Sequence, residues 1–314
     1  MLYKKPRLVI YHGECFDGTT AGWLLWTYFR DSDTEYCPCI YTPGNPFPET
    51  KAEEIFIVDY SFPRPTIEKL IKDGKKITLL DHHETALELE GLPGVIIDKN
   101  KSGASLTYEY LLKNMPDWWK DSSEFTRKRM ERYVAMVEDR DLFRFANPDS
   151  KAFTARQSAS DMTFRGWDDL YHDFAGDENQ FVTEGKLILS VHRTNISKFI
   201  QNNLIKMKLF GYEIPVLNVP KEYGSDSCAE MLARFPDAPF AVYYYDDALS
   251  YTKGQYVGVR SRKNNLVNVE PLAKRFNGGG HITAAAFRTT LDRVRMLEHD
   301  MNLWEQMCPG GKIA

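Results

Sequence analysis

Four short apolar runs in the first hundred residues of this chain each stop at an acidic residue or a histidine. Residues 8–11 precede His12, residues 55–58 precede Asp59, residues 77–80 precede Asp81, and residues 95–97 precede Asp98. Helical patterns lie between them at residues 21–30 and 66–72, with a weaker strand pattern at 36–41. Short strands that are apolar throughout and alternate with helices indicate a parallel sheet covered on both faces. We therefore expect an N-terminal α/β domain.

The rest of the chain is expected to form a helical connector and a second domain. Residues 105–140 and 184–208 show helical patterns. Three strand patterns follow at residues 214–219, 240–245 and 256–259. A length of 314 residues suits two domains that each bury a core. We place the first domain, with its connecting helices, at residues 1–205 and a smaller, mixed α/β domain at 206–314, and we expect the functional site in the cleft between them.

Composition and charge exclude several classes of protein. The chain has 43% hydrophobic residues and contains 18 Phe, 17 Tyr and 6 Trp, which a disordered chain would lack. A formal net charge of −4 argues against a protein that coats nucleic acid over its whole surface. No run approaches the roughly 20 apolar residues that cross a bilayer, and the start lacks the apolar core of a secretory signal. We expect a cytoplasmic protein with no membrane partner, whose five cysteines are reduced thiols.

The polar residues at the strand ends are expected to meet, because ligands bind beside the carboxyl ends of the strands in open parallel sheets. They are His12 with Asp17, Asp59, the triplet Asp81-His82-His83 and, later in the chain, Asp139. Imidazole and carboxylate together are ligands of divalent ions such as Mn²⁺, Zn²⁺ and Fe²⁺. The one thiol in this set is Cys15, which lies between His12 and Asp17.

Each of these residues alone has an ordinary structural explanation. A lone Asp at a strand end is more often a helix cap, and a lone His is more often a hydrogen-bonded polar residue. The triplet differs, because His82 and His83 would repel one another if both were protonated and they serve no packing purpose behind Asp81. The triplet therefore predicts a metal site.

The triplet Asp81-His82-His83 resembles the motif that names the DHH phosphoesterase superfamily, and further landmarks follow in the order found in that family. They are His12 before Asp17-Gly18, Val58-Asp59, Ser102-Gly103-Ala104-Ser105, Asp139, and Gly278-Gly279-Gly280-His281. The last of these resembles the glycine-rich signature of the DHH-associated C-terminal domain. The resemblance runs from about residue 8 to about residue 288. The spacing of the first landmarks is similar to that of a subgroup of exopolyphosphatase-like proteins and oligonucleotide phosphoesterases.

The resemblance implies a site for one or two divalent ions, commonly Mn²⁺, with Mg²⁺, Co²⁺ or Zn²⁺ as alternatives. The residues that would bind metal are, by position, His12, Asp17, Asp59, His82 and Asp139. Asp59 would bridge two ions, and His82 would bind the second of them. Asp81 and His83 would be catalytic, with His83 touching the substrate phosphate or orienting the site. Two such ions activate water for attack on phosphorus, so neither a serine nor Cys15 is needed as a nucleophile.

One departure from the family pattern concerns a second carboxylate. Many members carry Asp-Gly-Asp, whereas this chain has Asp17-Gly18-Thr19, and the interval from His12 to Asp17 is one residue longer than is common. A hydroxyl is a poorer metal ligand than a carboxylate. We therefore expect the second ion to be held more loosely, or Glu14 or water to replace the carboxylate.

A basic window at residues 251–288 is expected to bind phosphate. It contains seven basic residues and one acidic residue, a local net charge of +6. The residues that we assign to substrate binding are Ser102, Arg260, Ser261, Gly278, Gly279, Gly280 and His281. Arg gives bidentate contacts to phosphate, the glycines expose backbone N–H groups, and residues 284–286 are expected to form a tightly packed helix. The alternatives are a solvated basic face and a dinucleotide-binding loop, of which the second lacks the required G-x-G-x-x-G spacing.

These observations predict a cytoplasmic, metal-dependent phosphoesterase. The favoured substrate is a short single-stranded oligonucleotide degraded from one end, as by an exonuclease or nano-RNase, because the basic window is too compact for a long duplex. Polyphosphate, a cyclic nucleotide or a nucleotide monophosphate would need the same metals and phosphate contacts, so these substrates stay open. A nucleotide-binding regulator with a weakened metal site is a further alternative, supported by Thr19 alone. The sequence is compatible with a homodimer.

Overall fold

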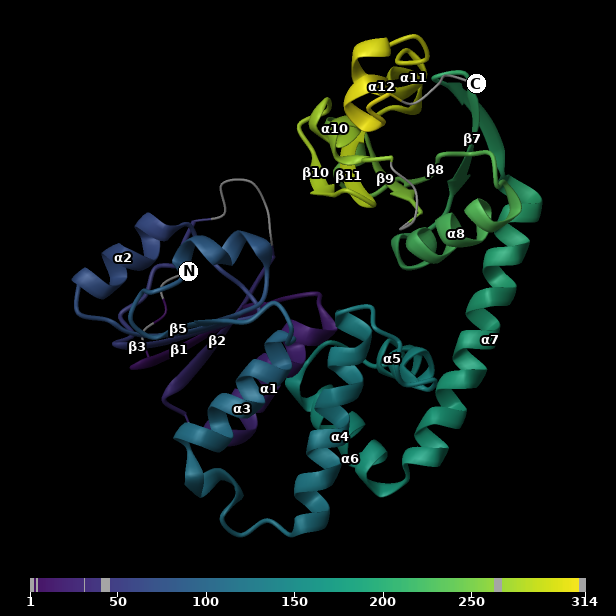
Figure 1. The fold of residues 1–314 in the computed structure, drawn as a ribbon. Coiled ribbons are helices and arrows are strands. Elements are labelled where there is room, and N and C mark those ends of the chain that lie inside the picture. Colours follow the sequence, from purple (N-terminus) through teal and green to yellow (C-terminus); the bar gives the residue numbers. More distant parts are fainter. Residues whose placement is uncertain (1–2, 4, 31, 41–45, 263–266, 311–314) are drawn as a thin grey trace. The chain divides into compact units, whose positions relative to one another are not determined.

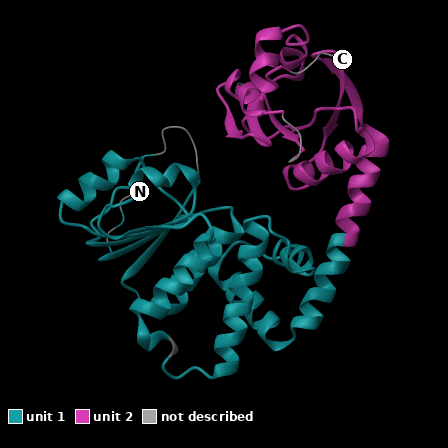
Figure 2. Ribbon diagram, in the orientation of Figure 1, with its two compact units in different colours: residues 1–189 teal, residues 190–314 magenta. Residues whose placement is uncertain are grey.

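The computed structural model describes residues 3, 5–30, 32–40, 46–262 and 267–310. The chain forms two compact units, Met1–Leu189 and Ser190–Ala314 (Figure 2). The division between them falls inside the long helix α7 (Glu178–Asn203), whereas the boundary predicted at residue 205 lies just beyond the end of that helix. Among the described residues, no helix combines the length and the apolar character that crossing a membrane requires.

The first unit is built on a parallel sheet of five strands in the order β2-β1-β3-β4-β5 (Figure 1). The strands are β1 (Arg7–His12), β2 (Thr34–Cys39), β3 (Glu54–Val58), β4 (Lys76–Asp81) and β5 (Val95–Ile97). Every neighbouring pair is parallel. The predicted parallel sheet is confirmed, and the polar residues His12, Asp59 and Asp81 lie at the ends of three adjacent strands.

Alternate residues of these strands enter two different hydrophobic cores. The covering helices are α1 (Phe16–Phe29) and α3 (Gly103–Asn114) on one face, and α2 (Arg64–Lys72) on the other (Figure 1). Val9 and Phe56 pack with Trp23 of α1, whereas Leu8 and Ile55 belong to the core that contains residues of α2. Because both faces of the sheet are buried, the strands appear in the sequence as continuous apolar runs.

Further helices enlarge the core that lies beneath α1. They are η2 (Pro116–Trp119), α4 (Glu124–Asp141), α5 (Ser150–Gln157) and α6 (Phe164–Gly176), whereas Leu89 of η1 (Glu84–Leu89) belongs to the core on the α2 side. Tyr133, Phe153 and Trp167 from these helices are buried in that core. Helix α1 begins at Phe16, earlier than the predicted start at residue 21, so Asp17 lies in its first turn.

The second unit contains a mixed sheet of six strands in the order β10-β11-β9-β8-β7-β6. The strands are β6 (Ile205–Leu209), β7 (Tyr212–Asn218), β8 (Phe240–Tyr245), β9 (Gln255–Ser261), β10 (Gly279–His281) and β11 (Ala284–Thr289). The helices are α8 (Lys221–Arg234), α9 (Ser250–Lys253), α10 (Glu270–Lys274), α11 (Leu291–Arg295) and α12 (Met301–Met307). β7 and β8 pair in parallel, and the other neighbouring strands pair antiparallel. The predicted mixed α/β class of this domain is confirmed.

Two segments that were expected to be helical are strands. Residues 205–208 belong to β6, which turns into β7 through Phe210 and Gly211 with φ angles of 55° and 83°. A two-residue hairpin turn of this kind needs positive φ at both positions. Residues 284–286 lie in β11, between β9 and β10. Hydrogen bonding to both neighbours outweighs the helix propensity of alanine there.

Candidate metal centre

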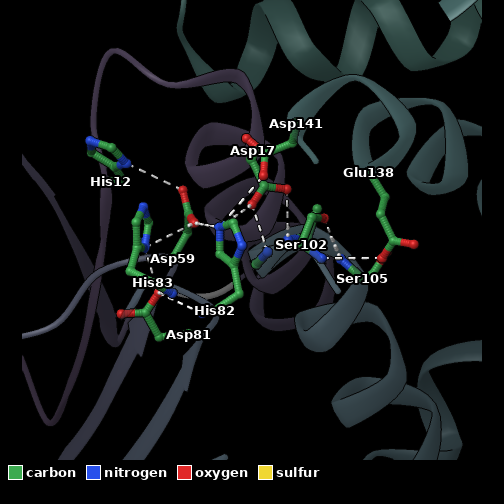
Figure 3. Close-up of polar contacts among 12 residues, drawn as sticks. His12, Asp17, Asp59, Asp81, His82, His83, Ser102, Ser105, Glu138 and Asp141 are labelled. Atoms are coloured by element: carbon green, nitrogen blue, oxygen red, sulfur yellow. Dashed lines mark hydrogen bonds and ion pairs between the residues drawn. The ribbon is translucent and has the colours of Figure 1, made fainter. Parts of the chain in front are cut away.

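Polar side chains from three neighbouring strands meet at the carboxyl edge of the first sheet (Figure 3). His12 ends β1, Asp59 directly follows β3, and Asp81 ends β4. Asp17 joins them from the first turn of α1 and Asp141 from the last residue of α4. The fold thus assembles one polar cluster from residues that are far apart in the sequence.

Asp59 lies in the middle of this cluster and is 1% exposed. Its Oδ1 is 3.1 Å from His82 Nε2, and its Oδ2 is 3.3 Å from His12 Nδ1. Burial opposes ionisation of Asp59, but the contacts with His12 and His82 and the charge of His83 outweigh burial and lower the pKa of this carboxyl. A buried, ionised carboxylate with both oxygens turned toward imidazoles is suited to bridge two ions.

Two glycines let helix N-termini approach the strand ends. A Cβ on Gly103 would lie 2.4 Å from the Cβ of Asp59, and a Cβ on Gly18 would lie 2.3 Å from the carbonyl oxygen of His12. Neither position has room for a side chain. As a result the first amides of α3, those of Gly103 and Ala104, donate hydrogen bonds of 2.6 and 3.0 Å to the carboxylate of Asp17. A helix N-terminus stabilises negative charge in this way.

Asp17, His82 and Asp141 form a group of ligand atoms that lie within 4.8 Å of one another. His82 Nε2 lies 3.5 Å from Asp141 Oδ2 and 3.8 Å from Asp17 Oδ2. Burial and the charge of Asp59 raise the pKa of both Asp17 and Asp141. The buried carboxylates of Asp17 and Asp59 and the half-buried carboxylate of Asp141 therefore repel one another, and a divalent cation among them would stabilise their ionised forms.

The donor set fits a divalent metal ion. The Oδ2 atoms of Asp81 and Asp141 are buried and accept no hydrogen bond within the described part of the chain. Leaving such an acceptor unsatisfied costs about 1–3 kcal/mol. Carboxylate oxygens and imidazole nitrogens are the ligands preferred by Mn²⁺ and by borderline ions such as Zn²⁺.

Asp81 is fully buried and orients His83. Its Oδ1 accepts hydrogen bonds from His83 Nδ1 at 2.7 Å and from the backbone amides of His82 and His83 at 2.7 and 3.2 Å. Burial opposes protonation of His83, but the hydrogen bond to Asp81 and the surrounding carboxylates raise the pKa of His83 to about 9. Of the two residues assigned to catalysis, Asp81 thus positions the ring of His83, and the His83 side chain is 29% exposed.

Asp139 does not reach the cluster, which corrects the sequence-based assignment. Its carboxylate accepts hydrogen bonds from the amides of Ala146 at 2.8 Å and Asn147 at 3.1 Å, and from the hydroxyl of Ser150. Asp139 and Asp141 are two positions apart on α4, and residues with that spacing face different sides of a helix. The carboxylate of this helix that lies beside His82 is therefore that of Asp141.

The two serines assigned to substrate binding have structural roles instead. Ser102 is fully buried, and its hydroxyl accepts a 3.2 Å hydrogen bond from the amide of Ser105, which caps α3. Ser261 is also buried, and its hydroxyl donates a 2.8 Å hydrogen bond to the carbonyl of Val267. Since both hydroxyls are withdrawn from solvent, neither is placed to bind a substrate.

Arg260 and His281 share one face of the second sheet. Ala284 of β11 pairs with Arg260 of β9 on one side and with His281 of β10 on the other. Residues directly opposite in antiparallel strands point to the same face. The guanidinium of Arg260 donates hydrogen bonds to Ser225 Oγ at 2.9 and 3.2 Å and to the carbonyl of Val259 at 3.0 Å, while His281 is exposed.

Strand packing explains two of the three glycines that were assigned to phosphate. A Cβ on Gly278 would lie 2.2 Å from the carbonyl oxygen of Ala286, and a Cβ on Gly280 would lie 2.4 Å from that of Ala284. Gly280 also has a φ of 150°, which side chains rarely adopt. Gly279 is exposed and a Cβ there would meet nothing within 4 Å, so packing does not account for it.

Some of the basic side chains in the window at residues 251–288 form contacts within the protein. Arg262 donates hydrogen bonds to the carbonyls of Leu232 and Phe235 at the end of α8, where backbone acceptors lack helical partners. Arg288 forms an ion pair with Asp247. Lys263 lies outside the described residues. The window is therefore less available to phosphate than its net charge suggested.

Two residues in the metal centre were missed by the sequence analysis. Asp141 is one of them. The other is Cys15, whose Sγ lies within 4.8 Å of ligand atoms of His12 and Asp59, so that these three residues form a further group of ligand atoms. Burial and the charges of neighbouring carboxylates raise the pKa of the Cys15 thiol. A signal for each existed, because Asp141 follows Asp139 in one acidic motif and Cys15 lies between two predicted ligands.

Comparison by sequence finds one distant relative. No family model matches the sequence. An uncharacterised protein of Acanthamoeba polyphaga mimivirus is 25% identical over 299 residues, which cover 88% of this chain and 66% of the viral protein. The chain thus spans slightly less than two thirds of that relative.

Comparison by structure finds proteins with the same fold. A pGpG-specific phosphodiesterase from Vibrio cholerae matches with a TM-score of 0.52 at 16% identity, covering 96% of this chain and 100% of that one. An exopolyphosphatase-related protein from Bacteroides fragilis gives 0.51 at 15%, covering 96% and 92%. The Mn²⁺ complex of RecJ from Thermus thermophilus gives 0.50 at 15%, covering 93% and 51%. The chain shares the fold of these solved proteins, as its resemblance to the DHH phosphoesterases implied. In this fold the Asp81-His82-His83 triplet stands at the end of β4, beside Asp59.

Proposed function

We propose that this protein is a divalent-metal-dependent phosphoesterase that hydrolyses short single-stranded oligonucleotides from one end. The observation that carries the proposal is the convergence of the carboxylates of Asp17, Asp59 and Asp141, of which the first two are buried, with His12 and His82. The DHH fold supports it, because solved proteins of this fold include a pGpG-specific phosphodiesterase and the exonuclease RecJ. The five free cysteines agree with a reducing, cytoplasmic location.

The chemistry would be hydrolysis without a protein nucleophile. Bound divalent ions supply a water whose pKa is lowered toward neutrality. Asp59 would bridge the ions, and the carboxylate-rich group of Asp17, His82 and Asp141 suits Mn²⁺. His83, held by its hydrogen bond to Asp81, would contact an oxygen of the scissile phosphate.

Phosphates of the substrate would be bound by Arg260, His281 and the backbone at exposed Gly279. An arginine and an exposed histidine on one sheet face, separated by a single strand, offer several donors to phosphate oxygens. This arrangement favours a short chain with few phosphates. Polyphosphate, cyclic nucleotides and nucleotide monophosphates present the same groups, so the substrate test includes them.

A substrate panel tests the proposed activity. With Mn²⁺, the purified protein is expected to cleave a linear dinucleotide faster than a cyclic dinucleotide, a cyclic mononucleotide or polyphosphate. EDTA should abolish cleavage, and added Mn²⁺ should restore it. Faster hydrolysis of polyphosphate would replace the oligonucleotide as substrate. Binding of nucleotides without hydrolysis of any substrate would contradict the enzymatic proposal.

Arg260→Gln and His281→Ala are each expected to lower kcat/KM for the dinucleotide by about 10-fold, since a hydrogen bond to a charged group contributes about 1.5–3 kcal/mol. The loss should appear mainly in KM, with the bound metal unchanged when it is measured by elemental analysis. Lys274→Ala is the matched control, because it removes a positive charge from the same unit at a residue that pairs with Glu270. Unchanged kinetics in both test variants would exclude this phosphate-binding face.

A further inference from the structure

Cys15 differs from the other four cysteines in its surroundings. All five cysteines lie in the described part of the chain and are free. Cys37 and Cys39 belong to the apolar core beside α2, Cys228 is buried in an apolar core of the second unit, and Cys308 packs against another. Cys15 instead lies in the turn between β1 and α1, with its Sγ within 4.8 Å of ligand atoms of His12 and Asp59. Its place among polar side chains is not explained by packing.

A second observation points to a ligand at the same place. Asp59 is almost completely buried, and its Oδ2 accepts no well-formed hydrogen bond from the described residues. This oxygen is the one nearest to His12 Nδ1, at 3.3 Å. A buried carboxylate oxygen that accepts no hydrogen bond of good geometry, together with an imidazole and a thiol, is the donor set of a borderline cation.

Cys15 also accounts for the carboxylate that the sequence lacks after Asp17. The sequence analysis expected a loosely held ion, or Glu14 or water in its place. Glu14 is exposed and does not belong to a group of ligand atoms among the described residues. Cys15 does belong to one, three residues after His12.

We infer that Cys15 is a metal ligand and that the site of His12, Cys15 and Asp59 selects a thiophilic divalent ion such as Zn²⁺ or Co²⁺ over Mn²⁺. This inference rests on the metal centre of the proposed function. On binding, the thiol of Cys15 loses its proton to solvent and its sulfur bonds to the ion. The carboxylate-rich group of Asp17, His82 and Asp141 has no sulfur and suits a harder ion, so the two halves of the centre differ in metal preference.

Spectroscopy of the metal-free full-length protein with Co²⁺ tests this inference without an activity assay. A thiolate ligand gives Co²⁺ a near-ultraviolet charge-transfer band, which oxygen and nitrogen ligands do not. The wild type is expected to show the band with about one bound Co²⁺ per chain, and Cys15→Ser should lose it. Cys308→Ser is the matched control and should keep it, because Cys308 is also partly exposed but lies against an apolar core.

Competition between metals gives a second readout. Cys15→Ser should weaken Zn²⁺ binding by about 100-fold or more, since even loss of a residue that only supports a metal ligand costs 10–100-fold. Cys15→Asp should shift the preference of this site from Zn²⁺ toward Mn²⁺ and should give no charge-transfer band with Co²⁺. Circular dichroism checks that each variant is folded, and if Cys15→Ser does not fold, the wild-type spectrum and Cys15→Asp decide the question.

The results separate this inference from the proposed function. Co²⁺ binding by the wild type without the band, or a band that persists in Cys15→Ser, would overturn the role of Cys15 even if the protein hydrolyses oligonucleotides. A band that depends on Cys15 in a protein that hydrolyses no phosphoester would support the metal ligand and contradict only the proposed activity.

Discussion

Asp59→Asn is expected to lower kcat/KM for oligonucleotide hydrolysis by about 10³-fold or more, because the stabilisation that metal ions give to a phosphoryl transition state amounts to several kcal/mol. Asn has nearly the same shape and tolerates the φ of 53° at this position, so the backbone should be preserved. What changes is the charge between His12 and His82, which both contact the carboxylate. The variant should therefore be folded but unable to hold the metal pair.

Thermal unfolding with and without Mn²⁺ checks the reason for this loss. Ligand at 100 times its dissociation constant stabilises the wild type by about 2.7 kcal/mol, and Asp59→Asn should lose this metal-dependent shift. Asp98→Asn is the matched control, since Asp98 also follows a strand of the same sheet, and its carboxylate accepts a hydrogen bond from the amide of Asn100 in its local turn. Full activity in Asp59→Asn would refute the metal centre.

Asp141→Asn and Asp139→Asn are expected to have opposite effects, although the residues lie two positions apart on α4. Asp141→Asn should lower turnover by about 100-fold or more through loss of a metal ligand. Its free energy of unfolding in EDTA should be unchanged or higher, because burial and Asp59 raise the pKa of Asp141 and thus disfavour its ionised form in the folded state. Replacing Asp141 with a neutral residue should therefore not lower the free energy of unfolding.

Asp139→Asn should instead destabilise the protein by about 2 kcal/mol, since an amide cannot accept all the hydrogen bonds that the carboxylate receives from Ala146, Asn147 and Ser150. The fraction that remains folded should bind Mn²⁺ as the wild type does. Urea unfolding in EDTA, paired with isothermal titration of Mn²⁺, measures both quantities. The reverse result, with metal binding lost in Asp139→Asn and retained in Asp141→Asn, would restore the assignment made from the sequence.

The errors of the sequence analysis have a common physical origin. Ser102 and Ser261 were placed beside the right motifs, but their hydroxyls satisfy backbone groups of the same fold. Gly278 and Gly280 were attributed to phosphate, whereas the approach of β11 leaves no room for a Cβ. In each case the residue satisfies a hydrogen-bonding or packing requirement of the fold that the local sequence pattern does not show.

The sequence by itself determined the sheet and the edge at which the candidate metal ligands meet. A strand that is buried on both faces must be apolar along its whole length, so a polar residue marks its end, as His12, Asp59 and Asp81 do. The tertiary structure alone decided which side chains reach the centre. The direction of a side chain depends on how its helix or turn is rotated relative to the sheet. This rotation places Asp141 and Cys15 among the ligand atoms and turns Asp139 away. A residue's chemical type can be read from the sequence, but the rotation of its helix or turn is set only by packing between segments.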